Sequence, residues 1–307
     1  MSNDLNDVAD RPITRVPLVP PALRTGRDAS PELQERRLLA LPGKGFPPIT
    51  GIETREIELA GLGCLSSAPP NPRGVLFHIH GGAFRSGNPQ RLRPFAETLA
   101  SLVNCTVILP TYPLAPENPF PAALVRLQDA YTEVATGQPL VLGGDSAGGN
   151  LALSLWHMGA AADALCLISP WLDLRVAAAS YERAAGTDQL FSREMAQDAR
   201  QMYLQGHSPD DPLASPLLGA VDNMPPTFIV AGGVEVLIDD TLALFSRLAT
   251  AGVDVECRVV PEMQHVAPTF GLDAPGAAAG LEAITGFLDR QFRRGSGPAD
   301  TPHIITE

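Results

Sequence analysis

The sequence predicts an α/β domain built around a mostly parallel β-sheet. From Arg55 onward, short apolar runs alternate with longer amphipathic stretches, as βαβ units require. The chain has 307 residues, of which 45% are hydrophobic and 18% charged, so it can bury a large core and is not wholly disordered. Its length suggests about two domains of 150 residues, although a single α/β domain of this size is ordinary.

The apolar runs are interpreted as strands and the amphipathic stretches between them as helices. The predicted strands are Arg55–Leu59, Val75–His80, Val107–Leu109, Leu140–Leu142, Ala164–Ile168, Thr227–Ala231 and Val255–Val260. The predicted helices are Leu92–Val103, Ala122–Thr136, Gly149–Met158, Asp240–Ala251 and Ala277–Arg293.

Three segments differ from this alternation and divide the chain. Residues 1–50 hold eight of the 30 prolines and contain one short helical pattern, at Pro31–Ala40. The interval of about 171–224 is too long for a crossover and includes a helical pattern at Ser192–Leu204, so we expect an inserted cap there. The main domain is then 51–294, and 295–307 is expected to be a frayed tail.

The net charge of the chain limits the classes of binding partner that can be expected. There are 22 Lys and Arg against 34 Asp and Glu, a net charge of −12, and no basic block is longer than Arg293-Arg294. Phosphate neutralisation needs clustered cations, so nucleic acid and anionic membranes are not expected as partners. The N-terminus is polar and acidic, and no stretch approaches the roughly 18 apolar residues of a membrane span. We therefore expect a cytoplasmic protein.

The cysteines give no sign of a disulfide framework or a zinc site. Cys64, Cys105, Cys166 and Cys257 are widely spaced and form no CxxC pair. This usage is typical of small buried side chains in a reducing compartment. Neither a metal nor a cofactor is expected.

The most informative motif is Gly144-Asp145-Ser146-Ala147-Gly148, which lies between a predicted strand and a predicted helix. A sharp strand-to-helix turn leaves no room for side chains two residues either side of the serine, which explains both glycines. Such a turn raises the Ser146 hydroxyl above the sheet and places the Ala147 N–H at a helix N-terminus. The pentapeptide alone is a weak signal, and the alternative is a glycine-rich turn with a solvated serine.

A second motif, His80-Gly81-Gly82, follows the strand at Val75. The unhindered N–H groups of Gly81 and Gly82, with that of Ala147, are candidates for an oxyanion hole. The alternative is a plain glycine turn. His78 and His80 have no carboxylate at ligand spacing and are interpreted as structural.

A nucleophilic serine needs a base, and His265 is the best candidate among six histidines. It follows the last predicted strand, where a loop at the carboxyl edge of a parallel sheet would bring it to Ser146. His303 lies in the tail, His157 falls in an apolar helical pattern, and His207 lies in the expected cap.

The acid that orients the histidine is sought after the strand at Thr227. Glu235 lies in the loop just past this strand, whereas Asp239 and Asp240 lie where the next helix starts and would suit a helix cap. The sequence alone could nominate any of the three, and the loop position favours Glu235. The order Ser146, acid, His265 is that of an α/β-hydrolase.

Together these motifs resemble the bacterial hormone-sensitive-lipase family of α/β-hydrolases, from about Gly74 to Phe287. The resemblance implies an esterase with eight main strands, helices on both faces, and a cap formed by the N-terminal segment and the inserted helices. Besides the two glycine motifs, it is carried by Tyr112–Glu117, Ser169–Asp173, Asp211–Leu217 and Pro261–His265.

Two positions depart from the family pattern. Pro113 stands where the family usually has arginine, so any ion pair of that arginine is missing. The acid, usually aspartate before Pro-Leu, is Glu235 before Val236-Leu237. A subgroup resembling acetyl hydrolases and monoterpene lactone hydrolases carries glutamate there.

The sequence therefore predicts a serine carboxylesterase for small to medium acyl esters. Ser146 is the expected nucleophile, His265 the base and Glu235 the acid, with Gly81, Gly82 and Ala147 as the oxyanion hole. A lactone hydrolase would need the same parts. A non-catalytic small-molecule receptor on this fold would be expected to lack part of the triad, which is complete here. The natural substrate and the oligomeric state, a homodimer included, are left open.

Overall fold

One mixed sheet of eight strands runs through the protein in a computed structural model that describes residues 46–47, 49–134 and 137–294. The strand order is β1-β2-β4-β3-β5-β6-β7-β8. β1 and β2 pair antiparallel, β2 pairs antiparallel with β4, and every other pair is parallel. The strands are β1 Glu53–Leu59, β2 Leu62–Ala68, β3 Val75–Ile79, β4 Thr106–Pro110, β5 Leu140–Asp145, β6 Ala164–Ile168, β7 Thr227–Gly232 and β8 Val255–Val260.

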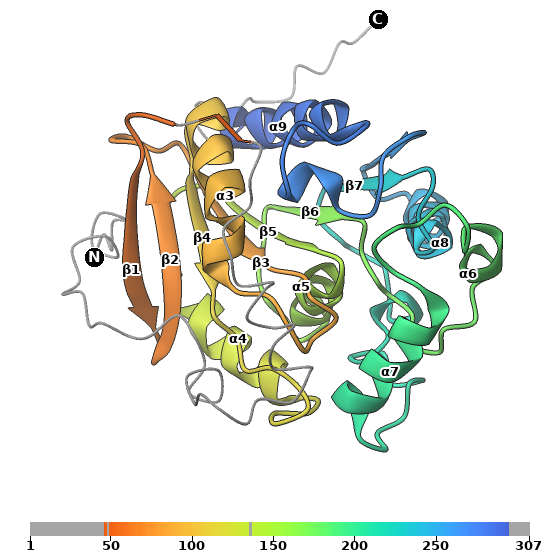
Figure 1. The fold of residues 1–307 in the computed structure, drawn as a ribbon. Helices are drawn as coiled ribbons and strands as arrows, with labels where there is room; N and C mark the ends of the chain where they lie inside the picture. The colour runs from red at the N-terminus through yellow and green to blue at the C-terminus, as the bar shows by residue number, and fades with distance from the viewer. Residues whose placement is uncertain (1–45, 48, 135–136, 295–307) are drawn as a thin grey trace, which may run out of the picture.

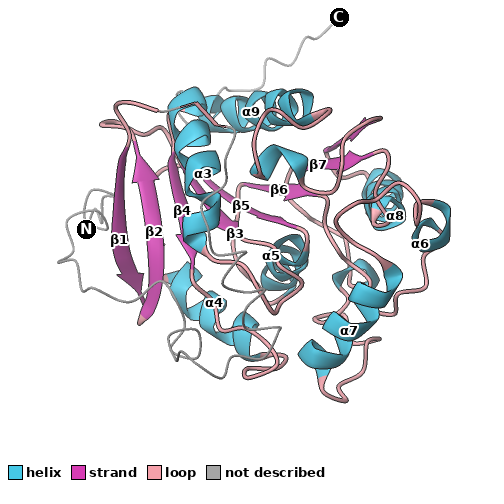
Figure 2. Ribbon diagram, in the orientation of Figure 1, coloured by secondary structure: helices cyan, strands magenta, loops and turns pink. Residues whose placement is uncertain are grey.

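Helices cover both faces of this sheet (Figure 1, Figure 2). α3 and α9 pack together on one face, and α4, α5 and α8 lie on the other. A separate apolar core fills each interface, so the central strands β3, β4 and β6 are buried along their whole length. The longer helices are α3 Pro89–Val103, α4 Ala122–Thr132, α5 Ala147–His157, α7 Arg193–Leu204, α8 Ile238–Thr250 and α9 Ala277–Arg294.

The prediction missed strand β2. Its sequence, LGCLSSA, has no β-branched or aromatic residue and does not alternate clearly between apolar and polar side chains. The neighbouring strands stabilise it instead. Ser67 is fully buried, and its hydroxyl lies 2.9 Å from the hydroxyl of Thr54 on β1.

Helix α3 begins three residues earlier than predicted. The Asn88 side chain accepts a hydrogen bond from the Arg91 N–H at 3.1 Å, and Pro89 occupies the first helical position. This pair is a strong start signal that lies before the first apolar position of the pattern. Asn104 then ends the helix in the left-handed conformation.

The predicted insertion lies between β6 and β7. It contains the short helix α6 (Ser180–Arg183), helix α7, and the 3₁₀ turn η2 (Pro216–Leu218). α7 starts at Arg193, one residue after the predicted start, because Ser192 is its cap: the Ser192 hydroxyl accepts a hydrogen bond from the Met195 N–H at 3.3 Å. The expected helix at Pro31–Ala40 and the tail lie outside the described residues, as does almost all of the N-terminal segment. No helix within the described ranges is long and apolar enough to span a membrane.

Candidate active site

Ser146 lies in the sharp turn that joins β5 to α5. Its backbone has a positive φ, with φ 53° and ψ −121°, and its N–H donates to the Ile168 carbonyl at 2.9 Å. The flanking glycines are required by close packing. A Cβ on Gly144 would lie 2.3 Å from the Gly148 carbonyl oxygen, and a Cβ on Gly148 would lie 1.9 Å from that of Ile79. The turn therefore holds a strained serine at the carboxyl edge of the sheet.

The loop after β8 brings His265 to Ser146. His265 Nε2 lies 2.9 Å from Ser146 Oγ, and both side chains are buried. The next residue, Val266, also has a positive φ, of 49°, and its N–H donates to the Ser169 hydroxyl at 3.2 Å. The end of β6 thus fixes the backbone beside the imidazole.

The loop after β7 brings Glu235 to the other side of the ring. Its Oε2 lies 3.2 Å from His265 Nδ1, and the glutamate is fully buried. Burial opposes the charged imidazole, but the hydrogen bond and charge of Glu235, helped by the charges of Asp188 and Asp145, raise the pKa of His265 above its ordinary value. The structure therefore brings the three predicted triad residues together in one hydrogen-bonded chain.

The two other carboxylates bind elsewhere, and the prediction that they cap the helix is wrong. α8 begins at Ile238 and has no side-chain cap; both aspartates lie in its first turn. Asp239 Oδ2 accepts from the Ser180 N–H at 2.8 Å, and its other oxygen pairs with Arg183. Asp239 therefore holds the inserted segment to the domain.

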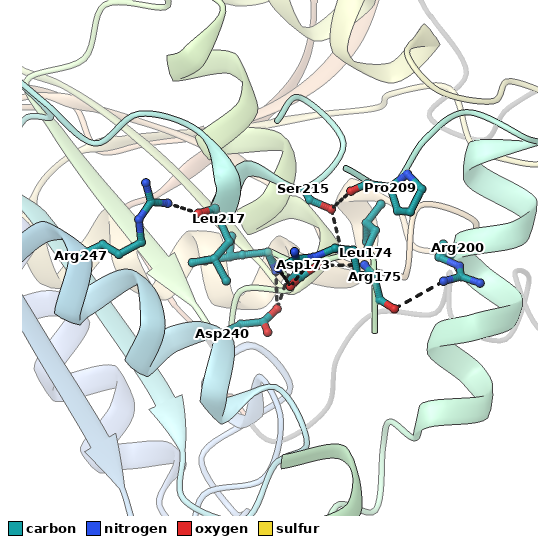
Figure 3. A network of polar contacts seen from close by, with 10 residues as sticks. Asp173, Leu174, Arg175, Arg200, Pro209, Ser215, Leu217, Asp240 and Arg247 are labelled. Carbon is teal, nitrogen blue, oxygen red and sulfur yellow. Dashed lines mark hydrogen bonds and ion pairs between the residues drawn. The ribbon is translucent and has the colours of Figure 1, made fainter. Parts of the chain in front are cut away.

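Asp240 reaches the chain just after β6. Its Oδ2 accepts from the N–H groups of Leu172, at 2.7 Å, and Asp173, at 3.0 Å. Figure 3 shows the network that continues from there to Ser215 and Arg175. Burial is the main cause that raises the pKa of Asp240 to about 7, with the charge of Asp173 adding to it against the two backbone hydrogen bonds.

A cavity of about 200 Å³ opens over the serine. Gly81, Gly82, Ser146 and His265 are among the residues that line it. A Cβ on Gly81 would lie 3.0 Å from the Cβ of Ser146, so its peptide runs directly beside the hydroxyl. Within the described chain, the N–H groups of Gly81 and Gly82 donate to no other protein group, which leaves them available. The walls are largely apolar and include Leu190, Phe191, Met195 and Phe270.

His78 and His80, which are interpreted from the sequence as structural, contact residues of the serine turn and of the glycine motif. His78 Nε2 lies 3.0 Å from Oδ1 of Asp145, the residue before the serine. His80 Nδ1 lies 2.7 Å from the Gly81 carbonyl, and burial lowers the pKa of His80 to about 4. At neutral pH His80 is therefore an uncharged ring at the edge of the cavity.

The remaining histidines lie away from Ser146. His157 is half-buried at the end of α5, with Nε2 3.0 Å from the Ala220 carbonyl, and His207 pairs with Asp211 at 2.6 Å. His303 lies outside the described residues. No cluster of three His, Cys, Asp or Glu side chains suited to a metal occurs in the ranges that the structure covers.

Three residues that contact the triad loops were not nominated from the sequence. They are Ser169, Asp188 and Gln264. Ser169 belongs to a motif that carried the family resemblance, so it had a signal. Gln264 also lies in such a motif, Pro261–His265, although nothing in the motif indicates which groups its amide contacts. Asp188 lies far from the triad residues in sequence and belongs to no such motif, so only the fold brings its partners near.

Comparisons with known proteins agree with this geometry. A family model described as the alpha/beta hydrolase fold matches residues 76–269. An esterase of Acinetobacter venetianus is 33% identical over 253 residues, which cover 79% of this chain and 84% of the relative. An acetyl-hydrolase of Streptomyces hygroscopicus is 34% identical over 224 residues, covering 70% of this chain and 75% of the relative.

Solved structures give the same assignment. The crystal structure of an esterase from the bacterial hormone-sensitive lipase family matches with a TM-score of 0.78 and 30% identity, covering 88% of this chain and 94% of the other. A hormone-sensitive lipase from a metagenome library matches with a TM-score of 0.77 and 27% identity, over 85% and 91% of the two chains. The chain therefore belongs to the bacterial hormone-sensitive-lipase family of α/β-hydrolases and is a carboxylesterase related to the acetyl-hydrolases.

Proposed function

We propose that this esterase cleaves small to medium acyl esters through an acyl-enzyme formed on Ser146. The observation that carries the proposal is the continuous chain of contacts from Glu235 through His265 to Ser146, with distances of 3.2 and 2.9 Å. A buried serine beside a buried, oriented imidazole is the arrangement that nucleophilic acyl transfer requires.

In the first half-reaction, Ser146 Oγ attacks the ester carbonyl carbon while His265 Nε2 takes the hydroxyl proton. Glu235 accepts a hydrogen bond from the Nδ1–H of His265, which fixes the tautomer in which Nε2 carries no proton and can act as the base. The negative charge of Glu235 then stabilises the imidazolium that forms. His265 then gives the proton to the leaving alcohol, and the bond from carbon to that oxygen breaks.

The tetrahedral intermediate places a negative charge on the former carbonyl oxygen. The N–H groups of Gly81 and Gly82 border the cavity beside the serine, and the N–H of Ala147 is at the free N-terminus of α5. We assign these three donors to the oxyanion hole. One such donor contributes about 3 kcal/mol to the transition state.

Water completes the cycle. His265 takes a proton from a water molecule that attacks the acyl carbon, and then returns the proton to Ser146 as the acid leaves. The proposed cycle uses water and the side-chain and backbone groups named above.

The size of the cavity supports the choice of substrate. A cavity of about 200 Å³ with largely apolar walls suits a short acyl chain or a small ring. The relative named acetyl-hydrolase agrees with a small acyl group. A kinetic panel of linear esters of increasing chain length and several lactones distinguishes an acyl esterase from a lactone hydrolase by kcat/KM.

The nucleophile is tested by Ser146→Ala. We expect a loss of several orders of magnitude in kcat for p-nitrophenyl acetate with circular dichroism unchanged, because both half-reactions pass through this oxygen. A fluorophosphonate should label Ser146 and no other residue. The matched control is Ser154→Ala: this buried serine lies on α5, and its hydroxyl only donates to the Leu213 carbonyl at 2.9 Å.

Two results would contradict the proposal. If Ser146→Ala keeps more than roughly a tenth of the wild-type rate, another nucleophile acts. If the wild-type protein binds esters but turns none over, the chain is a receptor on this fold and not the enzyme proposed.

A further inference from the structure

A short piece of the insertion, residues Thr187–Phe191 between α6 and α7, contacts both loops that carry the triad; we call it the strap. On the acid side, the Thr187 hydroxyl donates to the Val234 carbonyl at 2.9 Å. The Asp188 Oδ2 accepts from the Val236 N–H, also at 2.9 Å. These two bonds hold the residues on either side of Glu235.

On the histidine side, the contact is made by the side chain of Gln264, which directly precedes His265. Gln264 Nε2 donates to the Thr187 carbonyl, and Gln264 Oε1 accepts from the Gln189 N–H, both at 3.0 Å. One amide therefore uses a donor and an acceptor on the same stretch of strap. Such a paired contact fixes orientation as well as distance.

The strap is itself ordered by Asp188 and reaches the substrate cavity. The Asp188 Oδ1 accepts from the N–H groups of Leu190 and Phe191, each at 2.9 Å. The Phe191 ring lies nearly parallel to the His265 ring, with centroids 5.8 Å apart and an angle of 18° between the planes. Leu190 and Phe191 line the cavity, whereas Asp188 and Gln264 do not.

We propose that Asp188 and Gln264 are positioning residues that clamp the acid loop and the histidine loop to the strap, and so hold Glu235 and His265 in register with Ser146. This inference rests on the proposed function. The two loops follow the neighbouring strands β7 and β8, and the strap bonds to both, so it fixes their relative position. A displacement of about 1 Å at a reacting group can cost a hundredfold in rate.

The charges around the imidazole provide a second measurable quantity, the pKa of His265. The carboxylates that face His265 are Glu235, Asp188 and Asp145, and each favours the protonated ring. Removal of the Asp188 charge should therefore lower the pKa of His265. A residue that only stabilised the fold would leave this pKa unchanged.

The experiment uses the full-length enzyme with Gln264→Met and Asp188→Asn. Methionine keeps the volume of Gln264 but makes neither hydrogen bond, and asparagine keeps the shape of Asp188 without its charge. The matched control is Gln205→Asn, because Gln205 is another glutamine of the insertion and its amide donates to the Pro116 carbonyl at 2.6 Å, away from the triad. Active-site titration with a fluorophosphonate corrects each rate for the fraction of competent protein.

For Gln264→Met we expect kcat and the fluorophosphonate labelling rate to fall together by about tenfold or more, with KM changed less than about twofold, because Gln264 does not touch the cavity. For Asp188→Asn we expect the same loss, and the acid limb of kcat/KM should move to lower pH. Gln205→Asn should match the wild type in all three readouts.

The outcomes separate the two proposals. If both clamp variants keep the wild-type kcat, labelling rate and pH midpoint while Ser146→Ala is inactive, the clamp is wrong and the proposed function stands. If Ser146→Ala is active, the proposed function fails first. Should Asp188→Asn fail to fold by circular dichroism, Gln264→Met alone decides: an unchanged kcat and labelling rate overturn the clamp.

Discussion

Gly148 and Ile79 touch so closely that a Cβ on the glycine would stand 1.9 Å from the isoleucine carbonyl oxygen. This contact joins the first turn of α5 to the end of β3. It holds the Ser146 turn against the strand that leads into Gly81 and Gly82, so the proposed nucleophile and the proposed oxyanion donors belong to one closely packed unit.

Gly148→Ala should break that unit. Because the obstructing atom is backbone and not a flexible side chain, we expect about 3 kcal/mol lost from the free energy of unfolding, together with most of the activity. Urea denaturation and kcat measure the two effects. Gly137→Ala is the control, since a Cβ there meets nothing within 4 Å, and it should change stability by less than about 0.5 kcal/mol. A stable, active Gly148→Ala would mean that the contact is looser than described.

The acid can be identified by comparing kcat for Glu235→Gln, Asp239→Asn and Asp240→Asn under one set of conditions. Glutamine keeps the shape of Glu235 but removes the charge that stabilises the imidazolium. The corresponding change in the triad of a serine protease costs about 10⁴ in kcat, and we expect a loss of that order. The aspartate variants should change kcat only modestly. A crippled Asp239→Asn beside an active Glu235→Gln would transfer the role to Asp239.

The pH dependence of kcat/KM should show the raised pKa of His265. In the proposed mechanism the neutral imidazole of His265 is the base. Its neighbouring carboxylates keep the ring protonated to higher pH, so activity should be gained only as pH rises through a midpoint above 6.5. Glu235→Gln removes the largest favourable contribution and should move the midpoint to lower pH. A wild-type midpoint well below 6.5 would contradict the environment described for His265.

Asp240 should make stability depend on pH. Its pKa is raised to about 7 in the folded protein, whereas an unfolded aspartate titrates near 3.8. Between these values the folded state holds a proton that the unfolded state has lost, so stability is present below the unfolded pKa and falls as pH rises through this window. Asp240→Asn should flatten the decline. Urea unfolding at about pH 5 and about pH 8 measures how much the free energy of unfolding falls between these two pH values. An equal fall in the wild type and in Asp240→Asn would rule the effect out.

Thiol reagents and chelators should leave the esterase active. Cys64, Cys105 and Cys166 are buried, and burial raises the pKa of each thiol; half-buried Cys257 shows the same direction. None therefore has the thiolate that rapid alkylation needs. Iodoacetamide and EDTA treatments followed by kcat measurement make the test. Loss with EDTA that zinc restores would contradict the serine mechanism.

The sequence was sufficient where a local pattern determines the backbone. The turn around Ser146 needs glycine at both flanks, and the motif predicts this turn, which the structure shows; the role of Ser146 as nucleophile stays a prediction. Central strands such as β3 and β6 are short, mostly apolar runs, so their positions were predicted to within one residue. The order of serine, acid and histidine then placed the two remaining loops at the same edge of the sheet.

What the sequence missed depends on contacts between distant segments. Strand β2 is a strand because β1 and β4 pair with it, not because of its own residues. Asp239 and Asp240 look like helix caps, but the inserted segment offers them N–H donors 59 and 68 residues away, and these contacts displace the local role. The contacts of Asp188 and Gln264 could not be predicted from the sequence either, since their partners are backbone groups that any residue could supply.

The strap also limits how this enzyme can be altered. Leu190 and Phe191, which line the cavity over Ser146, are continuous in the chain with Thr187 and Asp188, which bond to the loop that carries Glu235. Selection for a new substrate that reshapes this segment will therefore tend to disturb turnover as well. Exchange of the whole insertion for that of a relative should succeed only when the replacement supplies hydrogen-bond partners for Gln264 and Val236. In directed evolution the strap and the two loops should therefore be exchanged together.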